Sequence, residues 1–233
     1  MGRIVAVSGG DLSSTELLNK HTVKLTNKAE PEVVFISTAS GDDEGYIAAV
    51  TDAFRRLNCK VKALRLCSGE YNSRETDALL SRADIIYVGG GDTVSMMRIW
   101  KEHGLDKKLK RIYENDSAVL SGLSAGAICW FNCGYSDSED AVKEVGRDYG
   151  WANGMLGIFH MAFCPHYDEE GRDSFDEALE NKGLPGLAME NNTAFVENCG
   201  RQYFIKSVPD ANAYRIKYVN GIIEKSTVDF AEA

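Results

Sequence analysis

The stretch Ala118-Val119-Leu120-Ser121-Gly122-Leu123-Ser124-Ala125-Gly126 places the pattern G-x-S-x-G between an apolar run and a helical one. Ala118 to Leu123 predicts a short buried strand and Ala125 to Phe131 the first turns of a helix, so Ser124 falls on the turn between them. Glycines two positions before and after the serine relieve crowding there, and the Ala125 amide would face a developing oxyanion. The pattern is typical of a catalytic serine, although a serine that begins a helix beside packing glycines has the same letters.

Short aliphatic runs alternate with helical patterns through the first 130 residues. Helical spacing of apolar residues runs from Tyr46 to Leu57, and a second helical pattern runs from Asp92 to His103. The alternation predicts an α/β fold in which helices cover both faces of a mostly parallel sheet, with ligands at the carboxyl ends of the strands. The predicted strands are Arg3 to Ser8, Glu32 to Ser37, Lys60 to Leu66, Asp84 to Val88 and Ala118 to Leu123.

The last third of the chain predicts antiparallel structure. The final two predicted strands are joined by Asn220-Gly221, a strong signal for a tight hairpin turn. We therefore expect a C-terminal antiparallel β appendage. Since we find no linker and no internal repeat, we expect residues 1–233 to form a single domain. The strands predicted here are Thr193 to Val196, Gln202 to Ser207, Ala213 to Val219 and Gly221 to Lys225.

Composition narrows the classes of partner. The chain has 26 Lys and Arg against 35 Asp and Glu, a formal net charge of −9, and no basic block, which argues against nucleic acid and against an anionic membrane surface. No signal peptide or run of 18 apolar residues is evident, so a cytoplasmic location is expected. The six cysteines lack paired spacing and predict reduced core residues; no metal and no cofactor are expected. A homodimer is possible.

Two further segments supply groups that a nucleophilic serine needs. Gly89-Gly90-Gly91-Asp92-Thr93 follows a buried strand, and bare amides of Gly90 or Gly91 could complete an oxyanion hole; the alternative is a turn for close packing before a helix capped by Asp92. Among four histidines, His166 is the best candidate for the base. It follows Pro165 where an apolar strand gives way to a polar run, whereas His160 stands at the strand's opposite end.

Three motifs together resemble the serine-peptidase family of aspartyl dipeptidase (peptidase E) and cyanophycinase. They are the glycine loop Gly89-Gly90-Gly91-Asp92-Thr93, the sequence Gly122-Leu123-Ser124-Ala125-Gly126-Ala127, and the sequence Cys164-Pro165-His166-Tyr167. The order of these motifs and the intervals between them also match the family, and the resemblance spans the chain from its start to about Val196. The resemblance implies a three-layer α/β/α sandwich like that of the class I glutamine amidotransferases. It also implies that Ser124 is the nucleophile and His166 the base, and that amides of Gly91 and Ala125 form the oxyanion hole.

The resemblance leaves the third member of the triad open. In aspartyl dipeptidase the acid follows soon after the turn that carries the serine (the elbow, here Gly122 to Gly126), which makes Asp137 and Glu139 candidates. Cyanophycinase-like members imply a glutamate after the histidine, which favours Glu190 in Leu184-Pro185-Gly186-Leu187-Ala188-Met189-Glu190-Asn191. Aligning on Thr193-Ala194 instead would put Asn191 at the glutamate's place.

The resemblance also assigns substrate-binding positions. Arg172 resembles the arginines that line the family's substrate pocket and could hold a carboxylate, or it could pair with neighbouring acids. The resemblance also implies that Asp92 is a substrate-binding residue in the same pocket. We expect a serine peptidase that cleaves small, Asp-containing peptides. The alternatives are an α/β module that binds a small anion at its glycine loop and an esterase of the α/β-hydrolase type.

Overall fold

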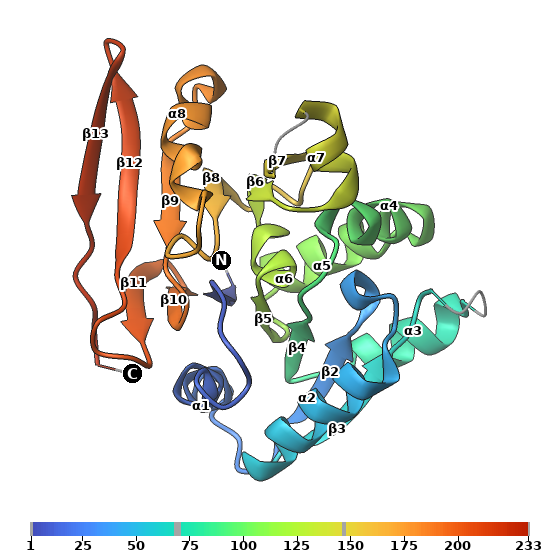
Figure 1. The fold of residues 1–233 in the computed structure, drawn as a ribbon. Coiled ribbons are helices and arrows are strands. Elements are labelled where there is room, and N and C mark those ends of the chain that lie inside the picture. Colours follow the sequence, from blue (N-terminus) through green and yellow to red (C-terminus); the bar gives the residue numbers. More distant parts are fainter. Residues whose placement is uncertain (1, 68–70, 146–147, 233) are drawn as a thin grey trace.

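The computed structural model describes residues 2–67, 71–145 and 148–232, so a few residues of the predicted domain 1–233 lie outside it. Its first half alternates strands and helices as the sequence predicts (Figure 1). Five adjacent parallel strands, from β1 to the edge strand β3, belong to a seven-stranded sheet with the order β11-β10-β1-β5-β4-β2-β3. These five are β1 (Arg3–Val7), β2 (Glu32–Ile36), β3 (Lys60–Leu64), β4 (Ile85–Val88) and β5 (Val119–Leu123), and they confirm the five strand predictions.

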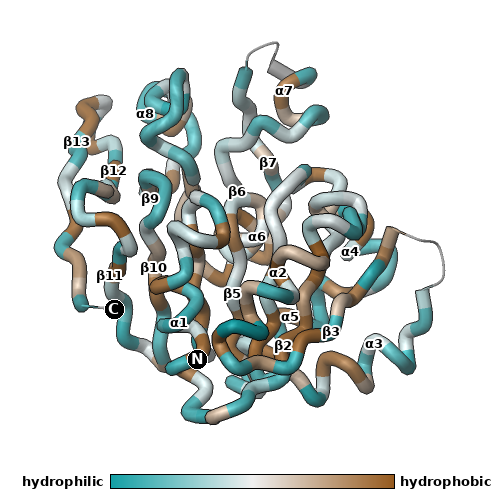
Figure 2. The backbone as a smooth tube through the Cα atoms, turned by 60° about the horizontal axis from the view of Figure 1, so that its bottom comes forward, coloured by the Kyte–Doolittle hydropathy of each residue, from teal (hydrophilic) through white to brown (hydrophobic). Residues whose placement is uncertain are grey.

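Helices pack on both faces of this sheet because its central strands are apolar on both sides. On one face, Phe35 of β2 and Tyr87 of β4 pack with Phe54 of α2 (Glu44–Arg56), and Val5 packs with α1 (Glu16–Lys24). On the other face the core is closed by α3 (Ser73–Leu80), α4 (Thr93–His103) and α5 (Leu105–Glu114). Figure 2 shows the hydrophobic strands between these more polar helices. The result is an α/β fold with three layers.

Six of the strands described after residue 130 form a second sheet, whose parallel centre the sequence did not predict. Its order is β13-β12-β9-β8-β6-β7, with parallel pairs at its centre and antiparallel strands at both edges. Phe131 of β6 stacks on Phe163 of β8 at 4.4 Å between ring centroids, and both rings belong to the main core. The strands are β6 (Phe131–Ser136), β7 (Gly150–Asn153), β8 (Phe159–Cys164), β9 (Gly186–Met189), β12 (Ala213–Val219) and β13 (Ile222–Thr227).

The predicted C-terminal appendage is divided between the two sheets. β10 (Thr193–Asn198) pairs antiparallel with β1, and β11 (Arg201–Lys206) continues the first sheet. β12 and β13 extend the second sheet, and the tight turn between them has positive φ at Asn220 and Gly221, as the sequence predicts. Short helices complete the chain: α6 (Ala125–Ile128), α7 (Glu139–Val145), α8 (Phe175–Leu179) and three single turns at Thr38–Ser40, Arg172–Ser174 and Glu180–Lys182.

The helix after the G-x-S-x-G pattern is shorter than predicted. The sequence predicts helix from Ala125 to Phe131, but α6 ends at Ile128 and β6 begins at Phe131. Trp130 and Phe131 are fully buried, and Phe131 begins β6 of the second sheet, so tertiary packing overrides local helical spacing. Among the described residues, no helix is long and apolar enough to cross a membrane.

Candidate active site

Ser124 lies on a strained turn at the carboxyl end of β5. Its backbone has φ 55° and ψ −113°, a sparsely populated positive-φ conformation that costs a non-glycine residue about 1–3 kcal/mol. The flanking glycines permit this turn, since a Cβ on Gly122 would stand 2.3 Å from the carbonyl oxygen of Gly126. A Cβ on Gly126 would stand 2.2 Å from the carbonyl oxygen of Val88. The turn holds the Ser124 side chain where the fold presents ligands, at the edge formed by the parallel strands.

His166 is in hydrogen-bond contact with Ser124. Its Nε2 lies 2.8 Å from Ser124 Oγ, although the two residues follow strands of different sheets, β5 and β8. His166 also has a left-handed backbone, with φ 54°, and its amide donates to the hydroxyl of Ser8, which in turn donates to the Met189 carbonyl. His160, the alternative base, is exposed on β8. The structure thus brings together the serine and the histidine that the sequence selects.

Asn191, not Glu190, contacts the other nitrogen of the imidazole. Asn191 Oδ1 lies 2.7 Å from His166 Nδ1. The Glu190 carboxylate instead accepts hydrogen bonds from the Asn212 amide at 2.7 Å and the Tyr214 hydroxyl at 3.1 Å, on β12 and the loop before it. This corrects the expected contact between Glu190 and His166: the two neighbours point to opposite sides of their loop, and packing against β12 decides which one faces the histidine.

The acids near the elbow do not face the histidine either. Asp137 Oδ1 lies 3.5 Å from Arg172 Nη2, and Glu139 forms an ion pair with Lys143. Both side chains are largely exposed, at 67% and 76%. Asp137 and Glu139 therefore belong to the surface around β6 and α7 instead of orienting His166.

The glycine loop Gly89-Gly90-Gly91 packs directly against Ser124. A Cβ on Gly90 would stand 3.4 Å from Ser124 Cβ, and the Gly90 amide donates to the Tyr46 hydroxyl at 3.3 Å. Burial raises the pKa of Tyr46, so this hydroxyl stays neutral, with the Gly90 hydrogen bond acting weakly in the other direction. Gly91 has φ 135°, and a Cβ there would stand 2.1 Å from the Ala39 carbonyl oxygen. Ala125 is the first residue of α6, where an amide has no partner within the helix.

The two predicted substrate-binding side chains have structural partners. Asp92 caps α4, because one carboxylate oxygen accepts from the Ser95 amide at 2.7 Å and the other from the Glu139 amide at 3.1 Å. Arg172 is only 2% exposed; its guanidinium donates to the Tyr135 carbonyl at 2.9 Å and stacks on the Tyr149 ring at 4.1 Å. The structure does not present this guanidinium to solvent, which corrects the expectation that it holds a substrate carboxylate.

Sequence reasoning missed two parts of the site. The turn after β1 contributes Ser8 and Gly9, and a Cβ on Gly9 would overlap both Asn191 Oδ1 at 2.0 Å and His166 Nδ1 at 2.3 Å. The polar run after His166 contributes Asp168 and Glu169, which contact Asn191. The double glycine after β1 could have signalled the first part, because β1 is parallel to β5 and ends at the same edge.

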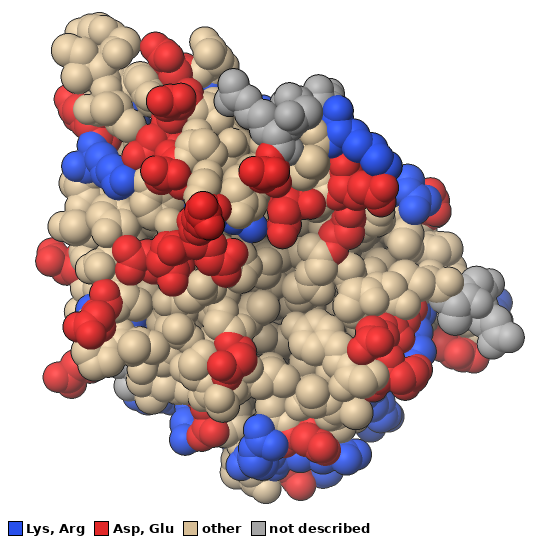
Figure 3. Space-filling model, in the orientation of Figure 1, with Lys and Arg blue, Asp and Glu red and all other residues tan. Residues whose placement is uncertain are grey.

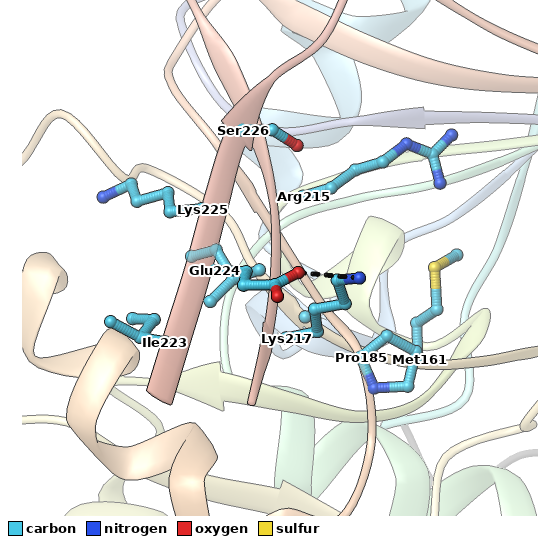
Figure 4. Close-up of a pocket in the computed structure, with 10 residues that line it drawn as sticks. Met161, Pro185, Arg215, Lys217, Ile223, Glu224, Lys225 and Ser226 are labelled. Carbon is cyan, nitrogen blue, oxygen red and sulfur yellow. Dashed lines mark ion pairs between the residues drawn. The ribbon is translucent and has the colours of Figure 1, made fainter. Parts of the chain in front are cut away.

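Carboxylates gather on the face of the molecule over α8, β8 and α7 (Figure 3). Asp168, Glu169 and Glu170, which follow His166 closely in the chain, are all exposed. A separate cavity of about 660 Å³ lies along β12 and β13, where Lys217 pairs with Glu224 at 2.8 Å (Figure 4). Its lining residues include neither Ser124 nor His166, so it is distinct from the candidate active site.

Comparison with known proteins agrees with this arrangement. The chain matches the model of peptidase family S51 over residues 4–202. It is 33% identical over 223 residues to the uncharacterized peptidase YgaJ of Bacillus subtilis (strain 168), an alignment that covers 93% of this chain and 92% of that relative. The fold, the site and these matches define a serine-type peptidase. The chain belongs to peptidase family S51.

Two crystal structures share the fold. A candidate peptidase E protein from Listeria monocytogenes EGD-e superimposes with a TM-score of 0.68 at 18% identity, covering 88% of this chain and 98% of that one. A peptidase from an acI-B1 Actinobacterium superimposes with a TM-score of 0.70 at 19% identity, covering 98% of this chain and 95% of that one. At these identities the likeness concerns the fold.

Proposed function

We propose that this peptidase hydrolyses small peptides through an acyl intermediate on Ser124, with His166 as general base and Asn191 as the residue that orients His166. The observation that carries the proposal is the 2.8 Å contact between Ser124 Oγ and His166 Nε2 on a turn that holds the serine at φ 55°. A serine hydroxyl is a weak nucleophile unless a base within hydrogen-bond reach removes its proton. Both the base and the strained turn support assignment of Ser124 as the nucleophile.

The chemistry follows from the positions of these groups. His166 Nε2 takes the Ser124 proton as Oγ attacks the scissile carbonyl, and then gives it to the leaving amine. The negative oxygen of the tetrahedral intermediate is held by the amides of Ala125 and Gly91, because the Gly90 amide donates to the Tyr46 hydroxyl. Water then attacks the acyl carbon as it gives a proton to His166, and His166 returns that proton to Ser124 Oγ as the ester bond breaks and the acid product leaves.

Asn191 takes the place that a carboxylate has in a Ser-His-acid triad. Its side-chain oxygen accepts a hydrogen bond from His166 Nδ1 and so fixes the ring orientation. An amide carries no formal charge, so it stabilises the imidazolium less than a carboxylate would. We therefore propose Ser124, His166 and Asn191 as the catalytic group in place of the Glu190 assignment.

The preference for Asp-containing peptides is a proposal that rests on the resemblance to aspartyl dipeptidase. Its expected anchor, Arg172, is buried against Tyr135 and Tyr149, so another group would have to receive the substrate carboxylate. A panel of Asp-X, Arg-X and β-linked Asp dipeptides of matched length tests this preference. Equal kcat/KM across the panel would contradict it without affecting the proposed nucleophile.

We also propose that the sandwich is of the class I glutamine amidotransferase type and that residues 1–233 form one domain. The support is a parallel sheet that carries the elbow at the carboxyl end of β5, and a main core that contains Ile4 of the first sheet together with Phe163 of the second. A single cooperative unfolding transition, measured by fluorescence and circular dichroism together, tests the one-domain proposal.

Covalent labelling tests the assigned nucleophile without knowledge of the substrate. A fluorophosphonate should modify Ser124 of the wild type, and neither Ser124→Ala nor His166→Ala should be labelled at a comparable rate. His160→Ala is the matched control, because it removes an exposed histidine from the preceding strand. Mass spectrometry locates the adduct. If the wild-type protein is not modified at any pH between about 6 and 9, the assignment of Ser124 as the nucleophile is wrong.

A further inference from the structure

The side-chain amide of Asn191 is held between His166 and two carboxylates. Its Nδ2 donates to Asp168 Oδ2 at 3.3 Å and to Glu169 Oε1 at 3.2 Å. The Asn191 backbone amide also donates to Asp168 Oδ1, at 2.7 Å. Asp168 therefore contacts both the backbone and the side chain of the residue that faces the histidine.

This arrangement determines which end of the amide faces the imidazole. An ionised carboxylate only accepts hydrogen bonds, so Asp168 and Glu169 both require the NH2 end of Asn191 to face them. The carbonyl end then faces His166, which must donate from Nδ1. A neutral imidazole with its proton on Nδ1 leaves Nε2 free to accept the Ser124 proton, as the base must. The two carboxylates thus select the reactive tautomer through the orientation of Asn191.

Glu169 also lies beside the imidazole itself. Its Oε1 is 3.1 Å from His166 Nδ1, and its side chain is 47% exposed, so water partly screens its charge. Of the groups on other elements, Ser8 and Ser124 are neutral and the Glu190 carboxylate faces Asn212 and Tyr214. The negative charges that face His166 therefore come from its own loop, with Glu169 in contact and Asp168 one residue removed.

We propose that Asp168 and Glu169 are positioning residues that complete the catalytic group: both fix the Asn191 amide, and Glu169 supplies the negative charge that Asn191 lacks. This inference rests on the proposed function, because it assigns roles relative to His166 as the base. As His166 takes the proton, the ring becomes a cation, and the nearby Glu169 carboxylate stabilises it. The loop after the histidine thus supplies the charge that a triad acid would supply from another segment.

Glu169→Gln separates charge from shape. The substitution keeps an oxygen that can accept from Asn191 but removes the negative charge. We measure the fluorophosphonate labelling rate between about pH 5 and pH 9. The plateau rate should fall about fivefold, and the midpoint of the pH profile should move to lower pH by about half a unit, because the imidazolium loses a stabilising charge.

Two further variants sharpen the result. Asp168→Asn should lower the plateau rate with a smaller movement of the midpoint, because Asp168 contacts Asn191 but not the ring. Glu170→Gln removes an exposed carboxylate from the same loop and should leave the profile unchanged. Circular dichroism checks that all three proteins fold.

The possible outcomes separate this inference from the proposed function. If the wild type is labelled at Ser124 and the profile of Glu169→Gln superimposes on it, the inference is overturned and the serine peptidase assignment stands. A slower rate with an unmoved midpoint likewise overturns the charge role of Glu169. A wild type that is never labelled contradicts the proposed function, and this inference with it.

Discussion

His166 Nδ1 and Asn191 Oδ1 lie 2.7 Å apart, joining a loop after β8 to a loop after β9. The pair is enclosed by the turn after β1, where Gly9 leaves no room for a side chain. Three segments that are far apart in the sequence therefore meet at one hydrogen bond. The geometry of the site depends on how closely these three segments pack.

Gly9→Ala should disable the site while the fold is retained. Its Cβ would stand 2.0 Å from Asn191 Oδ1 and 2.3 Å from His166 Nδ1, so the histidine or the asparagine must move. Because a displacement of about 1 Å costs on the order of 100-fold in rate, fluorophosphonate labelling should slow by about that factor. Gly45→Ala, in the first turn of α2, is the control and should label at the wild-type rate. Equal rates for both variants would contradict the close packing.

Replacement of Asn191 should affect catalysis more than replacement of its neighbour Glu190. Asn191→Ala removes the hydrogen bond to His166, worth about 1–1.5 kcal/mol, and should lower the labelling rate about tenfold. Glu190→Gln should keep the labelling rate within about twofold and lower the free energy of unfolding by about 1 kcal/mol, since its carboxylate faces Asn212 and Tyr214. The reverse order of effects would restore Glu190 as the orienting residue.

Arg172→Ala should reduce stability without changing substrate preference. The variant removes a buried guanidinium and leaves the Tyr135 carbonyl without its donor, so unfolding should become easier by about 2–4 kcal/mol. Denaturant titration measures this loss, and kcat/KM for acidic and neutral peptides should change by the same factor. Arg98→Ala is the control: it breaks an exposed ion pair with Glu102 and should lower the free energy of unfolding by less than about 0.5 kcal/mol. A selective loss on acidic peptides would return Arg172 to substrate recognition.

Cys67 should react slowly with alkylating reagents at neutral pH although it is exposed. The residue is exposed, but partial desolvation of its sulfur raises the pKa of the Cys67 thiol to about 11, and the nearby Asp42 carboxylate adds to the shift. Since the thiolate is the nucleophile and only about 0.1% of Cys67 is ionised at pH 8, the alkylation rate should rise about tenfold per pH unit to about pH 11. Peptide mapping after iodoacetamide treatment measures the rate, with an unstructured cysteine peptide as control. A rate that levels off near pH 8.5 would contradict the shift.

The sequence alone identified the elements with strong local signals. The five parallel strands are aliphatic runs bounded by turn residues, so their positions follow from the letters, as does the Asn220-Gly221 hairpin. The G-x-S-x-G pattern placed Ser124 at a strand end because only glycines fit at its two flanks. Pro165-His166 marked the proposed base because a strand gives way to a polar loop there, and the structure places His166 Nε2 in contact with Ser124 Oγ.

Tertiary packing decided the remainder. Nothing in the sequences of the strands of the second sheet indicates which strand pairs with which. The burial of Trp130 and Phe131 ends α6 earlier than the local spacing of apolar residues predicts. Glu190 and Asn191 are adjacent in the sequence and both are polar, so the letters could not say which one faces His166. Contacts with β12 turn Glu190 away, and the carboxylates of Asp168 and Glu169 fix Asn191 against the ring. Which groups are present in this site is thus written in the sequence, whereas which of them touch is set by long-range packing.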